Sequence, residues 1–214
     1  MKREMDVAAF HAKYDTHSDD RLHLFAAIAD HHVSGAVLYP GSYVDIAPSV
    51  YFDDVTYVDM DRRAARFFAH TGPVARLIDQ KRAMVGTAPL GGAGVRFHHA
   101  DFCDPLPVED ASVGLLVSLY AGFVSECCSR YLTTGGLLLA NNSHGDASMA
   151  SLDPLFSLVA VVPSRAGGYR VRTDDLDRYM VPKKGSAPTV EELRQTNKGV
   201  AFTRPAFAYL FQRG

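Results

Sequence analysis

The chain has 214 residues, of which 47% are apolar, 21% are charged and 10% are aromatic, with no tryptophan. This length and composition are typical of one folded domain spanning residues 1–214, and they exclude an intrinsically disordered protein. The 22 Lys and Arg residues balance 24 Asp and Glu residues without any basic block, which argues against nucleic acid or anionic lipid as a partner.

The first predicted elements alternate helices with buried strands. Apolar residues recur at helical spacing over residues 19–32, where Ser18 is the expected N-cap, and Gly35 ends the helix. Residues 1–34 are therefore expected to form an N-terminal helical segment, which could close over a site as a lid. The elements that follow are predicted as strands at 36–39 and 55–60, helices at 64–69 and 74–83, and a strand at 95–99.

The same alternation continues and then changes character in the last third of the chain. Residues 113–119 and 136–140 predict buried strands, with a helix at 122–131 between them. Strand-like runs at 155–162, 169–172 and 206–212 follow, separated by turns and only short helical pieces. The whole pattern predicts an α/β fold with a doubly wound, mostly parallel seven-stranded sheet, helices on both faces and a C-terminal antiparallel strand pair.

Cysteines and the N-terminus indicate a reducing, cytoplasmic location. The odd number of cysteines and their spacing argue against a disulfide framework or a zinc site, and Cys127 and Cys128 are expected to be buried on a helix. The N-terminal sequence is charged where a signal peptide needs an apolar core, and no apolar run approaches the ~20 residues of a membrane span. Nine histidines without metal-binding spacing predict no metal site.

Polar residues at the strand ends are the candidates for binding. In an open α/β sheet, ligands bind at the carboxyl ends of the strands, where the strand order reverses. Gly41 permits a tight turn after the first strand, Asp59 follows the second, and Asp101 follows the third. A carboxylate such as Asp59 can accept hydrogen bonds from both hydroxyls of a ribose. A dinucleotide motif of three glycines fails, because Tyr43 follows Gly41, so a nicotinamide oxidoreductase ranks last.

At this point the chain resembles the class I S-adenosylmethionine-dependent methyltransferases. The resemblance rests on the order of VLYPGS, VTYVDMD, VRFHHADF, LLVSLY and YLTTGGLLLANN, and it spans residues 22–214. It implies a Rossmann-like fold and S-adenosylmethionine as cofactor. It also implies that Gly41 lies against the amino-acid part of the cofactor, Asp59 holds the ribose, and Asp101 contacts the adenine. The full cofactor-binding set that it implies is Gly41, Ser42, Tyr43, Asp59, Met60, Asp101, Phe102, Ser118 and Leu119.

The glycine motif of this family is altered here, which leaves alternatives open. Tyr39, Tyr43 and Asp45 occupy three of the four positions that the family fills with an acidic residue and alternating glycines. A relative that has lost catalysis and serves as a binding protein is one alternative. An aminopropyl or aminocarboxypropyl transferase on the same scaffold is another. The leading hypothesis remains methyl transfer to a small-molecule acceptor, because no extra domain or basic surface suits a macromolecule. Assembly into a homo-oligomer is left open.

Methyl transfer from a sulfonium asks little covalent chemistry of the protein, so positioning of the reactants can suffice. A general base is needed only for an acceptor that carries a proton of high pKa. Tyr14 and His17, in the segment before the first predicted helix, are two residues that could serve as this base. The principal catalytic candidates are Tyr120, Asn142, His144 and Asp146. The alternative is that Asn141, Ser143 and Asp146 cap a helix over residues 147–152 and that His144 is solvated.

Overall fold

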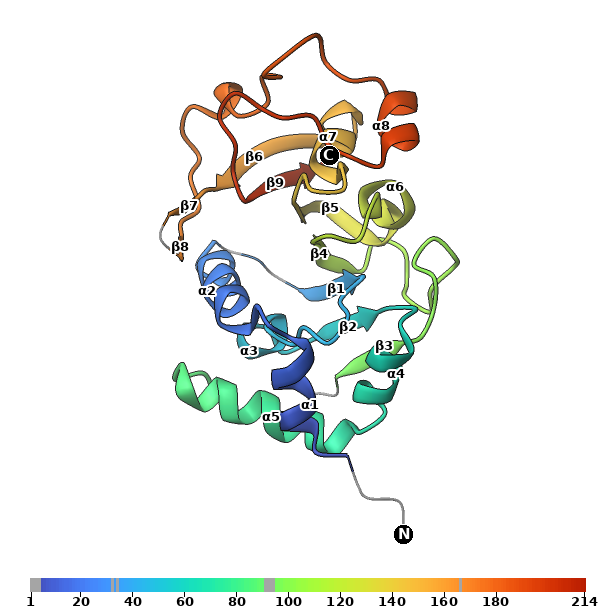
Figure 1. Cartoon of the computed structure of the whole chain (residues 1–214), viewed down its shortest axis with the longest axis vertical. Helices are drawn as coiled ribbons and strands as arrows, with labels where there is room; N and C mark the ends of the chain where they lie inside the picture. Colours follow the sequence, from blue (N-terminus) through green and yellow to red (C-terminus); the bar gives the residue numbers. More distant parts are fainter. Residues whose placement is uncertain (1–4, 32, 34, 91–94, 166) are drawn as a thin grey trace.

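The computed structural model describes residues 5–31, 33, 35–90, 95–165 and 167–214. Its main sheet has seven strands in the order β3-β2-β1-β4-β5-β9-β6 (Figure 1). Only β9 runs antiparallel to its neighbours, so six strands share one direction. The strands are β1 Ala36–Pro40, β2 Val55–Val58, β3 Arg96–His98, β4 Val113–Ser118, β5 Leu132–Ala140, β6 Phe156–Val162 and β9 Ala208–Arg213. The predicted mostly parallel α/β sheet with a C-terminal antiparallel pair is confirmed.

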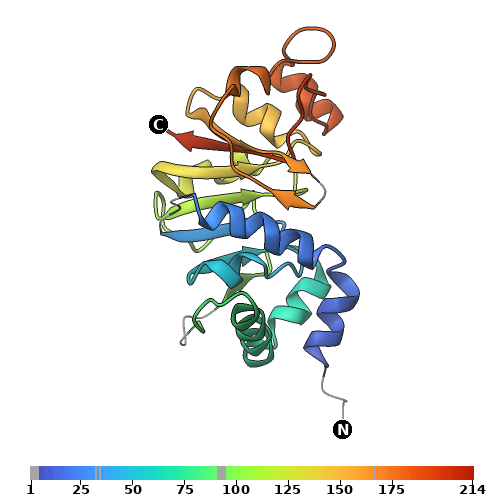
Figure 2. The same ribbon diagram turned by 90° about the vertical axis from the view of Figure 1, so that its left-hand side faces the viewer.

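Helices pack on both faces of this sheet. The helices are α1 Val7–Tyr14, α2 Ser18–Ala29, α3 Pro48–Tyr51, α4 Arg62–Phe68, α5 Thr71–Met84, α6 Val124–Cys128, α7 Asp146–Leu152 and α8 Val190–Thr196. Short 3-10 turns span Ser129–Tyr131 and Leu176–Arg178, and a small hairpin joins β7 Ser164–Arg165 to β8 Gly168–Tyr169. Figure 2 shows α2 lying across one face of the sheet.

The side-chain alternation of the strands builds two cores. On β1, Val37 and Tyr39 join one buried cluster, whereas Leu38 between them joins the other. Successive side chains of a strand point to opposite faces, so a strand covered on both sides must be apolar throughout. Phe25 of α2 belongs to the first cluster, and Val124 of α6 belongs to the second. This two-sided burial explains the continuous apolar runs in the sequence.

Several element boundaries differ from the prediction. Helix α2 begins at Ser18 and its N-cap residue is His17, so Ser18 does not cap it. The Ser18 hydroxyl instead accepts a hydrogen bond of 2.9 Å from Lys81 Nζ on α5. Strand β5 begins at Leu132 rather than residue 136, because Gly135, at a φ of +79°, sits in an irregularity within the strand. Beyond β8 only Arg172, which bridges to Val161, extends the pairing predicted for residues 169–172.

The expectation that the cysteines stay unpaired is wrong. Cys103, in the loop after β3, forms a disulfide with Cys127 of α6. The spacing of 24 residues gives no sign of this in the sequence, because the pairing depends on how the loop crosses back toward α6. Cys128 remains a free thiol and is buried, as expected. Among the described helices, none combines the length and apolar character needed to cross a membrane.

Candidate active site

The strand order reverses between β1 and β4, so their following loops leave the sheet in opposite directions. Gly41, directly after β1, has a φ of +65°, and its N–H donates a hydrogen bond of 2.8 Å to Val58 O. A Cβ on Gly41 would overlap the Ala121 side chain and lie 3.3 Å from Ala121 Cα. The two loops therefore touch at the reversal point, and only glycine permits both the backbone conformation and the contact.

Asp59 ties the end of β2 to the turn after β1. Its Oδ2 accepts a hydrogen bond of 2.7 Å from the N–H of Tyr43, and its Oδ1 accepts one of 2.7 Å from the N–H of Asp61. The side chain is half-buried, and Tyr43 has a φ of +49°. Because each carboxylate oxygen has two lone pairs, Asp59 keeps acceptor capacity beyond these two bonds.

Asp45, in the turn after β1, is buried. Its Oδ2 accepts a hydrogen bond of 3.1 Å from Tyr39 OH and lies 3.6 Å from Arg21 Nε, while its Oδ1 accepts from Ala47 N–H at 2.9 Å. Burial, reinforced by the charge of Asp15, raises the pKa of Asp45 to about 6, and Arg21 opposes that rise. The carboxylate thus links α2, β1 and the turn before α3.

A cavity of about 270 Å³ lies at these strand ends. Its wall comes from three stretches of chain: the end of α1 through the start of α2, the end of β1 with the turn after it, and the loop after β4. The lining residues are Tyr14, Asp15, Thr16, His17, Arg21, Tyr39, Gly41, Ser42, Tyr43, Val44, Asp45, Leu119 and Tyr120. The Ser42 hydroxyl is buried and has no hydrogen-bond partner among the described residues. Predicted residues Gly41, Ser42, Tyr43, Leu119 and Tyr120 therefore share one cavity.

Tyr120 and His144 lie together at this site. Tyr120 has a φ of +63° and is 47% exposed, and its ring meets the His144 ring edge to face, with centroids 6.5 Å apart. The Nδ1 of His144 is 3.0 Å from the Ser143 hydroxyl, which donates a hydrogen bond of 3.0 Å to Asn141 Oδ1. The loop after β5 thus positions His144 against a residue that lines the cavity.

Asn142 and Asp146 make contacts that hold the surrounding elements. The Asn142 side chain accepts hydrogen bonds from the N–H and hydroxyl of Ser148 and donates one to Val200 O. The buried Asp146 carboxylate accepts hydrogen bonds from the N–H and hydroxyl of Ser125, at the start of α6. Burial raises the pKa of Asp146 to about 6. Neither residue lines the cavity.

The remaining predicted residues lie at the β2 and β3 edge or beneath the site. Asp101 Oδ1 accepts a hydrogen bond of 2.9 Å from Cys103 N–H, and Phe102 is half-buried against the core on the α6 side. Met60 is 62% exposed, and its carbonyl oxygen lies 2.9 Å from His99 Nε2. Ser118 is buried below the loop after β4. Asp101, Phe102, Met60 and Ser118 are not among the residues that line the cavity, and Asp59 reaches it only through its hydrogen bond to the Tyr43 N–H.

Arg21 is a site residue that the sequence reading missed. Leu24, Phe25 and Ile28 follow it at three, four and seven residues, so Arg21 shares the buried face of α2. The sequence did contain a signal for this residue, because Arg21 places a cation where the helical periodicity requires an apolar side chain. Such a residue needs a partner in the folded protein.

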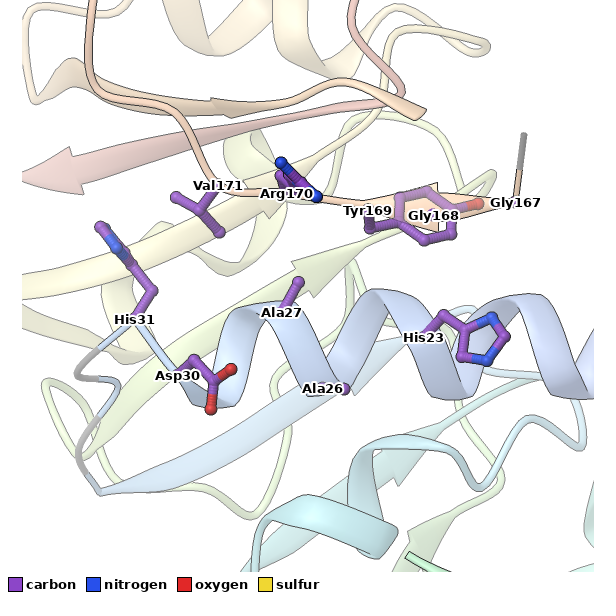
Figure 3. A pocket seen from close by; sticks show the side chains of 10 residues that line it. All are labelled: His23, Ala26, Ala27, Asp30, His31, Gly167, Gly168, Tyr169, Arg170 and Val171. Carbon is purple, nitrogen blue, oxygen red and sulfur yellow. The ribbon is translucent and has the colours of Figure 1, made fainter. Parts of the chain in front are cut away.

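A larger hollow of about 800 Å³ runs along α2 (Figure 3). Ala26 and Ala27 lie on its helix side, and His23, Asp30 and Arg170 are exposed around it. Ligand sites usually combine enclosure with converging polar groups, and this open groove has no buried charged group in its wall. No residue of the strand-end site lines it, so the smaller cavity is the better candidate. In the described residues no three metal-ligating side chains gather into a metal site.

Comparison with protein-family models and with curated proteins finds no match. Among solved structures, a SAM-dependent methyltransferase from Thermotoga maritima is similar to this chain, with 12% sequence identity and a TM-score of 0.48. The match covers 97% of this chain and 99% of that chain. An O-methyltransferase from Bacillus cereus, in complex with SAH, has 11% identity, coverages of 77% and 86%, and a TM-score of 0.45.

A third structure is the 1,6-didemethyltoxoflavin-N1-methyltransferase from Burkholderia thailandensis with bound 1,6-didemethyltoxoflavin and S-adenosylhomocysteine. It has 14% identity, coverages of 96% of this chain and 83% of that chain, and a TM-score of 0.42. At such identities and scores the similarity supports no argument about the ligand or the reaction of this chain. Those must be argued from its own residues.

Proposed function

We propose that this protein is an enzyme that transfers a methyl group from S-adenosylmethionine to a small-molecule acceptor. One observation carries the proposal: Asp59, at the end of β2, is joined by a 2.7 Å hydrogen bond to the turn that borders the cavity at the strand-order reversal. That reversal is where open α/β sheets bind their ligands, and a carboxylate at this position suits the two hydroxyls of a ribose.

The residues at the site suit the polar groups of the cofactor. Asp59 would take the ribose hydroxyls with the acceptor capacity that its two backbone bonds leave. The Ser42 hydroxyl, buried in the cavity wall without a protein partner, offers a donor and acceptor for the amino-acid part. Asp101 and Phe102, one strand further along, would contact the adenine, with Met60 beside them. Asp45 and Tyr43 stand where the family has glycines, but both are anchored by internal hydrogen bonds.

The protein would contribute mainly by holding the reactants. The cofactor, when bound, supplies an activated methyl group on a sulfonium that leaves as a neutral thioether. Orientation of reactants alone is worth up to ~7 to 11 kcal/mol of a barrier. Tyr120 would face the acceptor, and His144, held by Ser143, would accept a proton from an acceptor that loses one. The connection between α1 and α2 forms part of the wall and would act as the lid.

Calorimetric titration with S-adenosylhomocysteine tests the proposal directly. We expect binding at micromolar concentration, and a folded protein that binds neither this ligand nor S-adenosylmethionine would refute the function. Asp59→Ala should weaken binding by about 1.5 to 3 kcal/mol, the range for hydrogen bonds to a charged group. Asp61→Asn is the matched control, because it removes a carboxylate two residues away and still leaves a good N-cap for α4.

A second titration separates ribose binding from loop support. The wild-type protein should bind adenosine more tightly than 2′,3′-dideoxyadenosine, and Asp59→Ala should abolish this difference. If Asp59 serves only to hold the Tyr43 turn, the variant will weaken both nucleosides equally, and the ribose assignment fails.

A further inference from the structure

Arg21 carries its charge on a face of α2 that is otherwise apolar and buried. Leu24, Phe25 and Ile28, on the same face, are fully buried, and the Arg21 side chain is only 9% exposed. Removing a cation from water costs several kcal/mol unless partners replace the lost hydration. The protein must therefore either satisfy this guanidinium fully or reserve it for a ligand.

The protein partners of Arg21 hold it in place and use only part of its hydrogen-bonding capacity. Nε lies 3.6 Å from Asp45 Oδ2, beyond hydrogen-bond distance. The guanidinium carbon lies 5.0 Å from the Tyr120 ring centre and 5.7 Å from that of Phe207. The Tyr120 side chain is also a hydrogen-bond partner of Arg21. Because a guanidinium has five N–H donors, these contacts leave donors for a ligand.

The cavity wall adds an aromatic surface to this cation. Arg21 is the one Lys or Arg among the described residues that line the cavity, and Tyr14, Tyr43 and Tyr120 also line it. Tyr14 and Tyr43 meet edge to face, with centroids 6.4 Å apart. A guanidinium binds a carboxylate through two parallel hydrogen bonds, and aromatic walls favour a flat apolar ligand.

The two acidic residues of the wall have contacts of their own. Asp45 accepts hydrogen bonds from Tyr39 and Ala47, and Asp15 Oδ2 lies 3.2 Å from His11 Nε2. The cavity, at about 270 Å³, is smaller than the ~300 to 1,000 Å³ of sites for drug-sized ligands. It therefore suits a small molecule.

We propose that this cavity takes a small aromatic carboxylic acid, whose carboxylate binds Arg21 and whose ring packs against the tyrosines. The inference rests on the proposed function and names the class of its methyl acceptor. The position of Arg21 favours the acceptor over the carboxylate of the cofactor. Its guanidinium packs on Tyr120 and Phe207, which flank β4 and β9, whereas Asp59 and Asp101 follow β2 and β3 on the other side of the reversal point.

Titrations of the full chain with benzoate, benzamide and acetate test the inference. Wild-type protein should bind benzoate at least tenfold more tightly than benzamide, its uncharged counterpart, and more tightly than acetate, which lacks the ring. Arg21→Met keeps the apolar stem and should abolish the preference for benzoate over benzamide. Arg21→Lys should keep part of it. Arg172→Met, which removes an exposed arginine that pairs with Asp174 and does not line the cavity, should leave it unchanged. Circular dichroism confirms folding, and if Arg21→Met fails to fold, Arg21→Lys still has to lower the preference.

Equal binding of benzoate and benzamide to the wild type, or a preference that survives Arg21→Met, overturns the proposal. Equal binding of benzoate and acetate removes its aromatic part. Parallel titrations use S-adenosylhomocysteine and 5′-methylthioadenosine, which lacks the carboxylate. If Arg21→Met weakens only the former and the benzoate preference is absent, the carboxylate belongs to the cofactor, and the proposal is wrong. If neither nucleoside binds while the benzoate preference holds, the methyl-transfer function fails and the carboxylate site stands.

Discussion

Gly41→Ala probes the contact between the two loops at the reversal point. The substitution adds a methyl group at a φ of +65°, which costs roughly 1 to 2 kcal/mol for a residue with a side chain. The same methyl group would overlap the side chain of Ala121, and overpacking of this kind costs typically ~1 to 3 kcal/mol. The two terms predict a loss of about 2 to 5 kcal/mol in the free energy of unfolding, measured by urea denaturation followed by circular dichroism.

A double-mutant cycle separates the two terms. Ala121→Gly removes the overlapping group, so Gly41→Ala in that background should cost only the backbone term of roughly 1 to 2 kcal/mol. The recovery of about 1 to 3 kcal/mol is the coupling between the loops. If Gly41→Ala costs the same in both backgrounds, the loops do not touch as described, and a cost below about 1 kcal/mol would contradict the left-handed backbone at Gly41.

Three further predictions concern other parts of the fold. Burial raises the pKa of Asp146 to about 6 from an unfolded value near 3.9. The protonated carboxyl therefore stabilises the folded protein at low pH, and this contribution of about 3 kcal/mol is lost as the pH rises through about 6. The urea midpoint of the wild type should rise from pH 7.5 to pH 4.5, and Asp146→Asn should make this rise smaller. Tyr43→Gly removes the ring contact with Tyr14 but also relieves a φ of +49°, so it should lower the free energy of unfolding by less than about 1 kcal/mol. If Tyr43 obstructs the cofactor, the variant will bind S-adenosylhomocysteine more tightly than the wild type does. Reduction of the disulfide, or Cys103→Ser, should lower the midpoint of thermal unfolding. The bond to Cys127 closes a loop in the unfolded chain, which stabilises the folded protein by about 3 kcal/mol. An unchanged midpoint would show that the disulfide is not formed.

Much of the fold was predictable because a strand that is buried on both faces has a continuous run of apolar residues. The run at β1, Ala36–Pro40, is apolar throughout, since Val37 and Leu38 pack into different cores. The boundaries were less predictable where a local signal competes with sheet pairing. Gly135 looked like a turn before the strand, but pairing with β4 extends β5 back to Leu132. Ser18 looked like an N-cap, but its hydroxyl bonds to Lys81, a residue 63 positions away.

The site was predictable in part. Gly41, Tyr43 and Asp59 follow strands and come together because parallel strands end at one edge. The loop after β5 offered three catalytic candidates, Asn142, His144 and Asp146, that the sequence could not rank. The structure engages Asn142 and Asp146 in contacts with Ser148 and Ser125 and sets His144 against Tyr120.

The sequence by itself determined where the strands lie along the chain and which residues end each strand, because hydrophobic periodicity is a local property. Only the tertiary structure decided that Arg21 faces a cavity, that Asp45 takes a hydrogen bond from Tyr39, and that Cys103 meets Cys127. These pairings depend on how loops from separate strands fold over the same edge of the sheet. The free energy of these pairings comes from burial and close contact, and both arise only when the partner residues are brought together in the folded structure.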